Sequence, residues 1–320
     1  SIFSDLNQLE DISFDDNYSG ICGITRDELD NDLEDEIATM AESVGLSSDD
    51  CKEKLKKMYD GYHFSSNGED VYNPFSLLTA LKKHRFGSYW FETGTPTFLV
   101  RKLRETWFDV RKFTDGTLYV TAGMLSDYRA ENPDPVPLLY QTGYLTIAAY
   151  DRLTQIYTLT FPNDEVKYGF LESLLPEYVE NSFPGSGCDV FTLRRYTESG
   201  NLEGIKNVLT ALFAGIPYLS GDAPFEHYFQ TVIYLVFTLL GKFVQCEMHT
   251  WSGRIDCVVQ TKQFIYLFEF KRDASSEEAI HQINSMGYAL PFANDPRKLF
   301  KIGVNFNSDT RMLSGWQTEE

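Results

Sequence analysis

Hydrophobic positions recur with helical spacing through the first part of the chain, between recognisable helix-start signals. Thr25 with Glu28 three residues later has the pattern of a capping box, which predicts a helix running to about Val44. Asn73 followed by Pro74 predicts the start of another helix, because Asn caps helix ends and Pro suits the first helical position. We therefore expect the first part of the chain to be mostly helical.

A different pattern follows near the middle of the chain. The segments 143–149 and 155–161 are rich in β-branched and aromatic residues and flank a turn near Asp151, which predicts a β-hairpin. Pro162 and Asn163 then predict the start of a helix. A helix, a hairpin and a helix suggest a winged-helix-like unit, which can contact DNA. The segment lacks a basic face, so packing of this unit as a lid is the stronger interpretation.

The segment 181–189 is rich in Gly, Ser and Pro and has no periodicity, which indicates a domain boundary. We predict one domain at 1–185 and a second at 186–320. In the second, strongly apolar and alternating stretches predict the order helix, three strands, helix, strand. These elements are expected at 226–240, 242–250, around Asp256, 264–270, 276–290 and 299–305. The predicted fold class is therefore mixed α/β, with a helical region followed by an αβββαβ domain.

The composition narrows the possible functions. The 320 residues include 47 acidic and 28 basic side chains, for a formal charge of −19. This balance argues against a general grip on nucleic-acid phosphates, although a bound cation offsets such charge locally. The five cysteines form no C-x-x-C pair, which favours reduced residues of a cytoplasmic protein. The longest apolar run, near 232–240, is too short to cross a membrane.

Candidate chemistry concentrates in the stretch 253–271. Alternate residues of a strand share a face, so Glu269 and Lys271 point the same way, and Asp256 lies on the preceding strand. The strand 264–270 is apolar on both faces, and a buried Glu is costly unless it is paired or binds a cation. These residues are therefore a site candidate, although a Glu/Lys pair on a half-solvated sheet is also common without a function.

An Asp, a turn and Glu-x-Lys in an aromatic strand resemble the PD-(D/E)XK nuclease superfamily, and so do the element order and the phrases AIHQINSMGYA and KIGVNF. The resemblance implies that Asp256 and Glu269 bind Mg²⁺ or Mn²⁺ and that Lys271 orients water and stabilises charge. It also implies site roles for Glu226, as a helix carboxylate, and for Gln282. Related nucleases often pair that Gln with a Tyr, whereas Tyr288 here belongs to a different helical face.

The segment from Ser1 to about Leu103 resembles the C-terminal part of predicted bacterial AAA-ATPase-like domains that accompany such nucleases. The phrases YDGYHF, VYNPFSLLTAL and SYWFETGTPTFLVRKL carry this resemblance. No G-x-x-x-x-G-K-[ST] occurs in the chain, and the resemblance places that P-loop upstream of Ser1. We therefore expect no ATPase activity from this chain, and no bound cofactor other than a metal.

Two functions remain open, beside a purely structural role as a fragment of a larger assembly. The first is a metal-dependent nuclease acting on nucleic acid, with DNA favoured over RNA, attached to an ATPase-like region. The second is a nuclease-like module that binds a partner or nucleic acid without cutting it. Retention of Asp256, Glu269 and Lys271 favours the enzyme, whereas the acidic charge and the missing P-loop favour the binding module.

Overall fold

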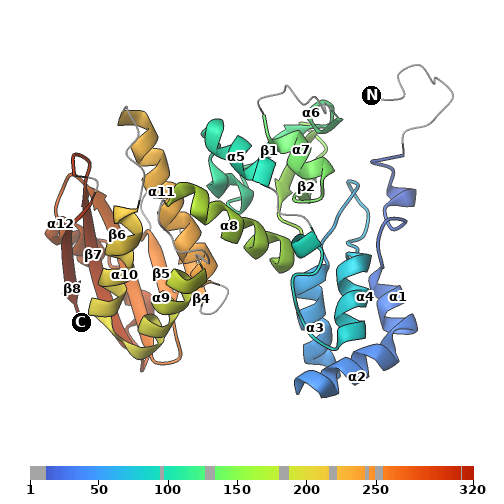
Figure 1. The fold of residues 1–320 in the computed structure, drawn as a ribbon, viewed down its shortest axis with the longest axis horizontal. Coiled ribbons are helices and arrows are strands. Elements are labelled where there is room, and N and C mark those ends of the chain that lie inside the picture. Colours follow the sequence, from blue (N-terminus) through green and yellow to red (C-terminus); the bar gives the residue numbers. More distant parts are fainter. Residues whose placement is uncertain are drawn as a thin grey trace. The chain divides into compact units, whose positions relative to one another are not determined.

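The computed structural model describes residues 12–93, 97–126, 134–179, 187–215, 222–241, 245–248, 255–310 and 312–320. The chain divides into two compact units, Ser1–Ser173 and Leu174–Glu320, which are treated separately below (Figure 1). The predicted boundary after residue 185 lies outside the described residues and stays a prediction. No helix in the described ranges is both long and apolar enough to cross a bilayer.

The first unit begins with four helices whose starts follow the predicted caps: α1 (Arg26–Asp32), α2 (Glu34–Val44), α3 (Ser48–Tyr59) and α4 (Pro74–Lys83). The Thr25 side chain accepts from the Glu28 amide, and the Glu28 carboxylate accepts from the Thr25 amide. The single helix expected from Thr25 to Val44 is instead two helices, because the backbone at Leu33 leaves the helical region (φ −124°, ψ 20°). Buried apolar side chains of these four helices form one core.

The rest of the first unit surrounds a small antiparallel sheet with strand order β1 (Tyr119–Thr121), β3 (Ile156–Thr160), β2 (Thr146–Asp151). The predicted hairpin is confirmed as β2 and β3. Around the sheet lie the short helices α5 (Thr97–Glu105), α6 (Ala122–Ser126) and α7 (Val136–Gln141). Helix α8 (Asp164–Tyr178) follows β3, and its residues from Leu174 onward belong to the second unit. The Asn163 side chain caps α8 by accepting from the Val166 amide at 3.1 Å. The winged-helix comparison and the ATPase-like assignment stay predictions.

The second unit contains a five-stranded mixed sheet with strand order β4-β5-β6-β7-β8. Its elements in the chain are α9 (Gly187–Ser199), α10 (Leu202–Ala214), α11 (Asp222–Leu240), β4 (Gln245–Met248), β5 (Cys257–Gln260), β6 (Phe264–Arg272), α12 (Ser276–Ser285), β7 (Lys298–Asn307) and β8 (Met312–Glu319). The predicted order helix, three strands, helix, strand is confirmed from α11 to β7, and so is the mixed α/β class. Among the described strands of this sheet, only β6 and β7 pair in parallel.

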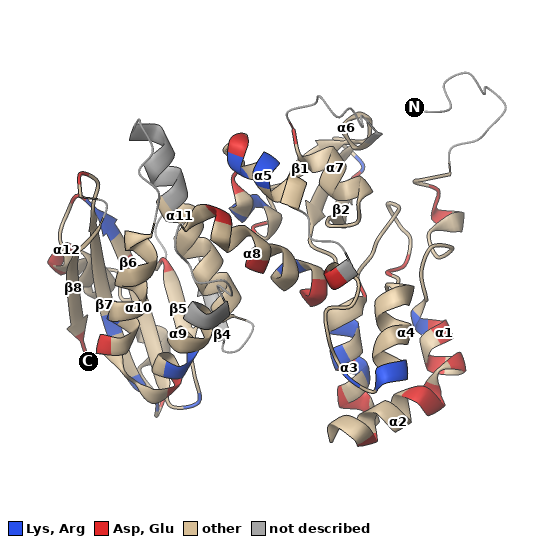
Figure 2. Ribbon diagram, in the orientation of Figure 1, with Lys and Arg blue, Asp and Glu red and all other residues tan. Residues whose placement is uncertain are grey.

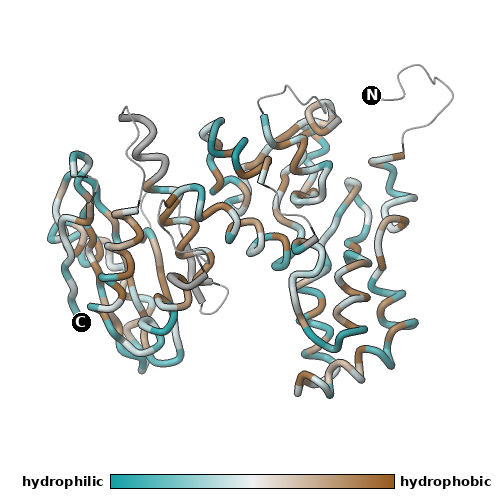
Figure 3. The backbone as a smooth tube through the Cα atoms, viewed as in Figure 1, coloured by the Kyte–Doolittle hydropathy of each residue, from teal (hydrophilic) through white to brown (hydrophobic). Residues whose placement is uncertain are grey.

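Helices cover both faces of this sheet. On one face, the rings of Phe237 from α11 and Phe268 from β6 lie 5.1 Å apart, and the Tyr266 hydroxyl donates to the Thr197 carbonyl of α9 at 2.6 Å. On the other face, α12 packs its isoleucines against Ile265 and Leu267. Figure 3 shows hydrophobic residues along the inner strands of the sheet and hydrophilic residues in turns at its ends. Helices therefore enclose the middle of β6 on both faces of the sheet, and Glu269 is the next residue along the strand after Phe268.

Candidate active site on the second sheet

Strand pairing brings the two candidate carboxylates together. Cys257 pairs with Phe268 in the antiparallel ladder of β5 and β6, so the next position along places Asp256 opposite Glu269. Asp256 precedes β5 and is half-buried, and its Oδ2 accepts from the Phe270 amide at 2.8 Å. This hydrogen bond satisfies the Phe270 amide, which lies beyond the last residue pair of β5 and β6, and it orients the Asp256 carboxylate. Two negative side chains thus meet on one face of the sheet, as the spacing predicted.

Glu269 is the more deeply buried of the pair, with 2% of the residue exposed. Its Oε1 accepts from Lys271 Nζ at 2.9 Å, and its Oε2 is buried without a hydrogen-bond partner among the described residues. Burial raises the pKa of Glu269, and the charge of Asp256 raises it further, while Lys271 and the Asp256 amide oppose the shift. The carboxylate is therefore held in an environment that disfavours its charge and leaves one oxygen unused.

Lys271 links β6 to α12. Its Nζ donates to Glu269 Oε1 and to Gln282 Oε1 of α12, the latter at 2.5 Å. About a quarter of the Lys271 side chain remains exposed (24%), so the ammonium group lies at the border between core and solvent. Gln282 is thus in direct contact with the candidate site. Tyr288 lies beyond the end of α12 and packs against the core beside Ile280 and Ile283.

A glycine that the sequence analysis did not single out positions α12. Gly303 of β7 pairs with Glu269, and a Cβ built on it would lie 2.3 Å from the Ser276 carbonyl oxygen and 3.0 Å from Ala279 Cβ. The first turn of α12 therefore rests directly on the strand beside Glu269. A glycine inside a strand pattern, as in KIGVNF, is the signal that indicates such a close approach. Because α12 packs closely on β7 at Gly303, Gln282 of α12 lies within hydrogen-bond distance of Lys271.

We expect Gly303→Ala to displace α12 from the sheet, because the new methyl group overlaps a backbone carbonyl. Overpacking of this kind costs about 1–3 kcal/mol of unfolding free energy. Urea unfolding measures the loss. Gly315→Ala on β8 is the matched control. Its new Cβ would lie 3.1 Å from its nearest neighbour, the Ser276 hydroxyl oxygen, so we expect a smaller loss of unfolding free energy. Equal stability of Gly303→Ala and the wild type contradicts the close approach of α12.

The carboxylates of Asp256 and Glu269 supply part of the coordination that a divalent cation needs. Mg²⁺ and Mn²⁺ prefer oxygen ligands, and the buried Oε2 of Glu269 and the adjacent carboxylate of Asp256 supply them. Within the described ranges, no group of three or more Asp, Glu, His or Cys side chains has the geometry of a metal site. Glu226 belongs to α11, but its side chain lies outside what the structure describes. Water and further residues would have to complete the coordination.

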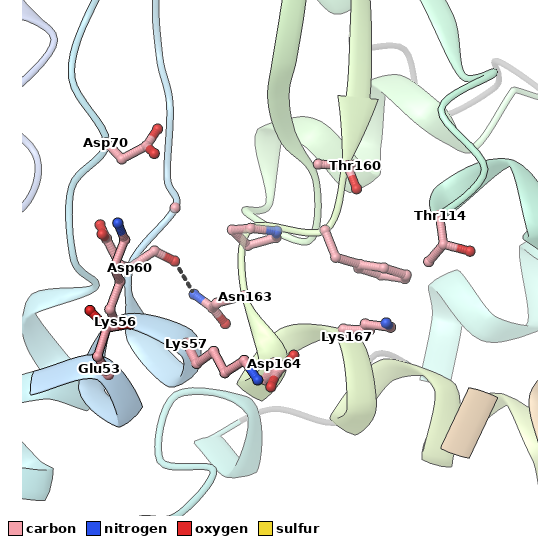
Figure 4. A pocket seen from close by; sticks show the side chains of 13 residues that line it. Glu53, Lys56, Lys57, Asp60, Asp70, Thr114, Thr160, Asn163, Asp164 and Lys167 are labelled. Carbon is pink, nitrogen blue, oxygen red and sulfur yellow. Dashed lines mark hydrogen bonds between the residues drawn. The ribbon is translucent and has the colours of Figure 1, made fainter. Parts of the chain in front are cut away.

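A separate pocket of about 510 Å³ lies in the first unit, between α3 and the start of α8 (Figure 4). Asp60 is buried there, which raises the pKa of its carboxyl, and its carbonyl accepts from the Asn163 side chain at 3.0 Å. Both lysines and carboxylates line the pocket: Glu53, Lys56, Lys57, Asp70, Asp164 and Lys167. Neither charge dominates, so this pocket offers less definite chemistry than the sheet.

The second unit is thus an α/β domain in which two carboxylates and a lysine meet at adjacent strands of a helix-covered mixed sheet. Residues 224–316 form a domain of the PD-(D/E)XK nuclease superfamily, whose sequence model they match. This finding agrees with the resemblance carried by Asp256, Glu269 and Lys271. It covers the second unit from α11 into β8 and does not extend to the first unit.

Comparison with curated proteins extends over the whole chain. The chain is 36% identical, over 330 aligned residues, to an uncharacterized protein in the vnfD 5′ region of Azotobacter chroococcum mcd 1. The match covers 100% of this chain and 60% of that protein, so the chain spans little more than half of the relative. No solved structure matches the chain. These comparisons provide no evidence for an AAA-ATPase-like region in the first unit.

Proposed function

We propose that the chain is a divalent-metal-dependent nuclease that hydrolyses phosphodiester bonds of nucleic acid at Asp256, Glu269 and Lys271. The observation that carries this proposal is the buried Glu269 carboxylate, which lies against Asp256 with Oε2 unpartnered and Oε1 bound to Lys271. Asp60 and Glu165 also have a buried carboxylate oxygen without a partner, so what distinguishes Glu269 is the second carboxylate and the ammonium group beside it. The superfamily match over 224–316 supports the same assignment.

Each residue has a distinct role in this proposal. Asp256 and Glu269 would hold the metal, which when bound supplies positive charge to the scissile phosphate and lowers the pKa of water. Lys271 places its ammonium group beside them, where it orients the attacking water and stabilises charge that develops on phosphate oxygens. Gln282 positions Lys271 by accepting from Nζ. Glu226 is retained as a further candidate carboxylate of this site.

The choice of substrate, the coupling to an ATPase-like region and the location in the cell are also proposals. DNA is favoured over RNA as the substrate, and coupling to an ATPase-like region rests on the resemblance of the phrases in the first unit. A cytoplasmic location is inferred from the cysteine pattern of the sequence.

Cleavage of nucleic acid tests the proposal. We expect the wild-type chain to cut labelled single-stranded or duplex DNA with Mg²⁺ or Mn²⁺ and to be inactive in EDTA. Asp256→Asn is the control for contaminating nucleases and should be inactive with either ion. If neither DNA nor RNA is cut with either ion, even by a longer protein that includes the upstream region, the non-cutting binding module becomes the better assignment.

A further inference from the structure

The stretch 282–294, which runs from Gln282 through the end of α12 and into the segment after it, contains no Asp, Glu, Lys or Arg. Since 23% of the chain is charged, about three charged residues would be expected in a stretch of this length. The acidic residues of α12, Glu277 and Glu278, lie in its first turn (Figure 2). The surface that continues from Gln282 therefore has no side chain that pairs with a phosphate by charge.

Two large apolar side chains of this stretch are exposed. Met286 is 54% exposed and Leu290 is 75% exposed, whereas Tyr288 and Phe292 pack on the core between α12 and the sheet. Elsewhere in the described part of the second unit, the exposed large apolar side chains are Phe191 and Met312. Packing within the domain therefore accounts for Tyr288 and Phe292 but not for Met286 and Leu290.

Contacts on both flanks of α12 fix its orientation over the sheet. Gln282 reaches Lys271 of β6 on one flank, and Asn284 donates to Glu319 of β8 at 3.0 Å on the other. The Met286 amide donates to the Gln282 carbonyl at 3.0 Å, a bond between residues four apart that extends the helical geometry by one residue. Residues at this spacing lie on the same side of a helix, about 5–6 Å apart. Met286 is therefore on the β6 flank of α12, one turn from Gln282.

Leu290 continues the apolar surface beyond Met286. Gly287, with φ 68°, turns the chain after α12, and its carbonyl accepts from the Leu290 amide at 3.0 Å. A Cβ built on Gly287 would lie 2.7 Å from Leu290 Cδ1, so the Leu290 side chain lies directly against the residue after Met286. Met286 and Leu290 together are called the apolar strip below. The strip begins one helical turn from the glutamine that contacts the candidate active site.

We propose that the apolar strip contacts unpaired bases of the nucleic acid whose phosphate occupies the candidate active site, an inference that rests on the proposed function. A strand bound at Asp256, Glu269 and Lys271 extends past them, and an uncharged surface suits its bases rather than its phosphates. Methionine is flexible and polarisable and makes favourable contacts with aromatic rings, so it accommodates different bases. Met and Leu side chains also insert between base steps, at a cost in stacking that unpaired bases largely avoid. The strip therefore selects single strands or unpaired segments.

An oligonucleotide that lacks bases tests this contact. Lys271→Ala serves as the parent, because cleavage should be blocked while the metal is still bound. With Mg²⁺ present, anisotropy of fluorescein-labelled oligo(dT) is compared with that of the same oligonucleotide carrying abasic residues at its central positions. We expect the parent to bind oligo(dT) at least about fivefold more tightly. Adding Met286→Ala or Leu290→Ala should weaken oligo(dT) binding about fivefold, since about half or more of each side chain remains to be buried, and should leave abasic binding unchanged.

Met312→Ala is the matched control for these variants. Met312 is 49% exposed on β8, which β7 separates from β6, so this variant should bind both oligonucleotides like the parent. All three variants should melt at the temperature of the parent. Equal binding of the two oligonucleotides by the parent overturns the inference, and so does full discrimination in both Met286→Ala and Leu290→Ala.

Competition by a duplex tests the selection of unpaired bases. Oligo(dT) annealed to oligo(dA) keeps its bases stacked, so it should displace labelled oligo(dT) from the parent at least about tenfold less well than unlabelled oligo(dT) does. Equal competition by the duplex assigns the contact to the backbone and contradicts the inference.

These measurements distinguish the apolar strip from the nuclease site. A chain that cuts nucleic acid but binds the abasic oligonucleotide as tightly as oligo(dT) disproves only the strip. A chain that discriminates between the two oligonucleotides through the strip but never cuts disproves only the nuclease. A chain that binds neither oligonucleotide contradicts both.

Discussion

Replacing Lys271 with alanine is expected to reduce cleavage at least about 100-fold, because one preorganised group that stabilises transition-state charge contributes about 10²–10³ in kcat. The ammonium group lies 2.9 Å from Glu269 Oε1, beside the two carboxylates that we propose as metal ligands. Single-turnover cleavage of a labelled oligonucleotide measures the effect. Lys262→Ala, at the exposed turn before β6, is the matched control and should cut normally. Cleavage by Lys271→Ala at the wild-type rate removes Lys271 from the mechanism.

The same variant should keep its response to metal. An ion present at a hundredfold excess over its dissociation constant stabilises the folded chain by about 2.7 kcal/mol. Mg²⁺ or Mn²⁺ should therefore raise the melting temperature of the wild type and of Lys271→Ala, in which Glu269 Oε1 loses its competing ammonium partner. Asp256→Asn and Glu269→Gln each remove a charged ligand and should weaken the response. The response should grow as the pH rises through the elevated pKa of Glu269, because the charged carboxylate is the form that binds the ion.

Phe268→Ala is expected to lower the unfolding free energy by about 3–5 kcal/mol, the usual cost of truncating a buried aromatic residue. Phe268 has 0% exposure at the centre of β6, with its ring 5.1 Å from that of Phe237 and 6.0 Å from that of Phe270. The surrounding side chains come from both a strand and a helix, so the cavity cannot collapse easily.

Urea unfolding measures this loss. Leu290→Ala is the control, because Leu290 is 75% exposed and its truncation should change stability by no more than about 0.5 kcal/mol. A loss below about 1 kcal/mol in Phe268→Ala contradicts the two-sided burial of β6. Such burial is what makes the unpartnered oxygen of Glu269, one residue further on, costly without a ligand.

Local signals in the sequence predict much of this fold. The helix caps at Thr25 and Asn73 are contacts between residues close in the sequence, so the sequence alone predicts them, and both are present in the structure. Alternation along β6 likewise predicts that Glu269 and Lys271 share a face, because the side-chain period of a strand is two. The contact of Asp256 with Glu269 follows once β5 and β6 pair as an antiparallel hairpin.

Features that depend on distant residues were not predictable in this way. β8 is half-exposed and carries few β-branched residues, so it forms a strand mainly because the edge of β7 is available to pair. The three-residue β1 has a single buried residue, Val120, and gives no periodic signal. The role of Gly303 depends on where α12 lies, which the pattern of β7 alone does not indicate.

Diffraction from crystals soaked in Mn²⁺ shows directly whether Asp256 and Glu269 together bind a divalent ion, because manganese has a usable anomalous signal. We predict an anomalous peak between the two carboxylates, within about 2.0–2.6 Å of an oxygen from each, and no such peak in crystals of Glu269→Gln. Crystals that bind Mn²⁺ elsewhere while Lys271 keeps its bond to Glu269 would contradict it.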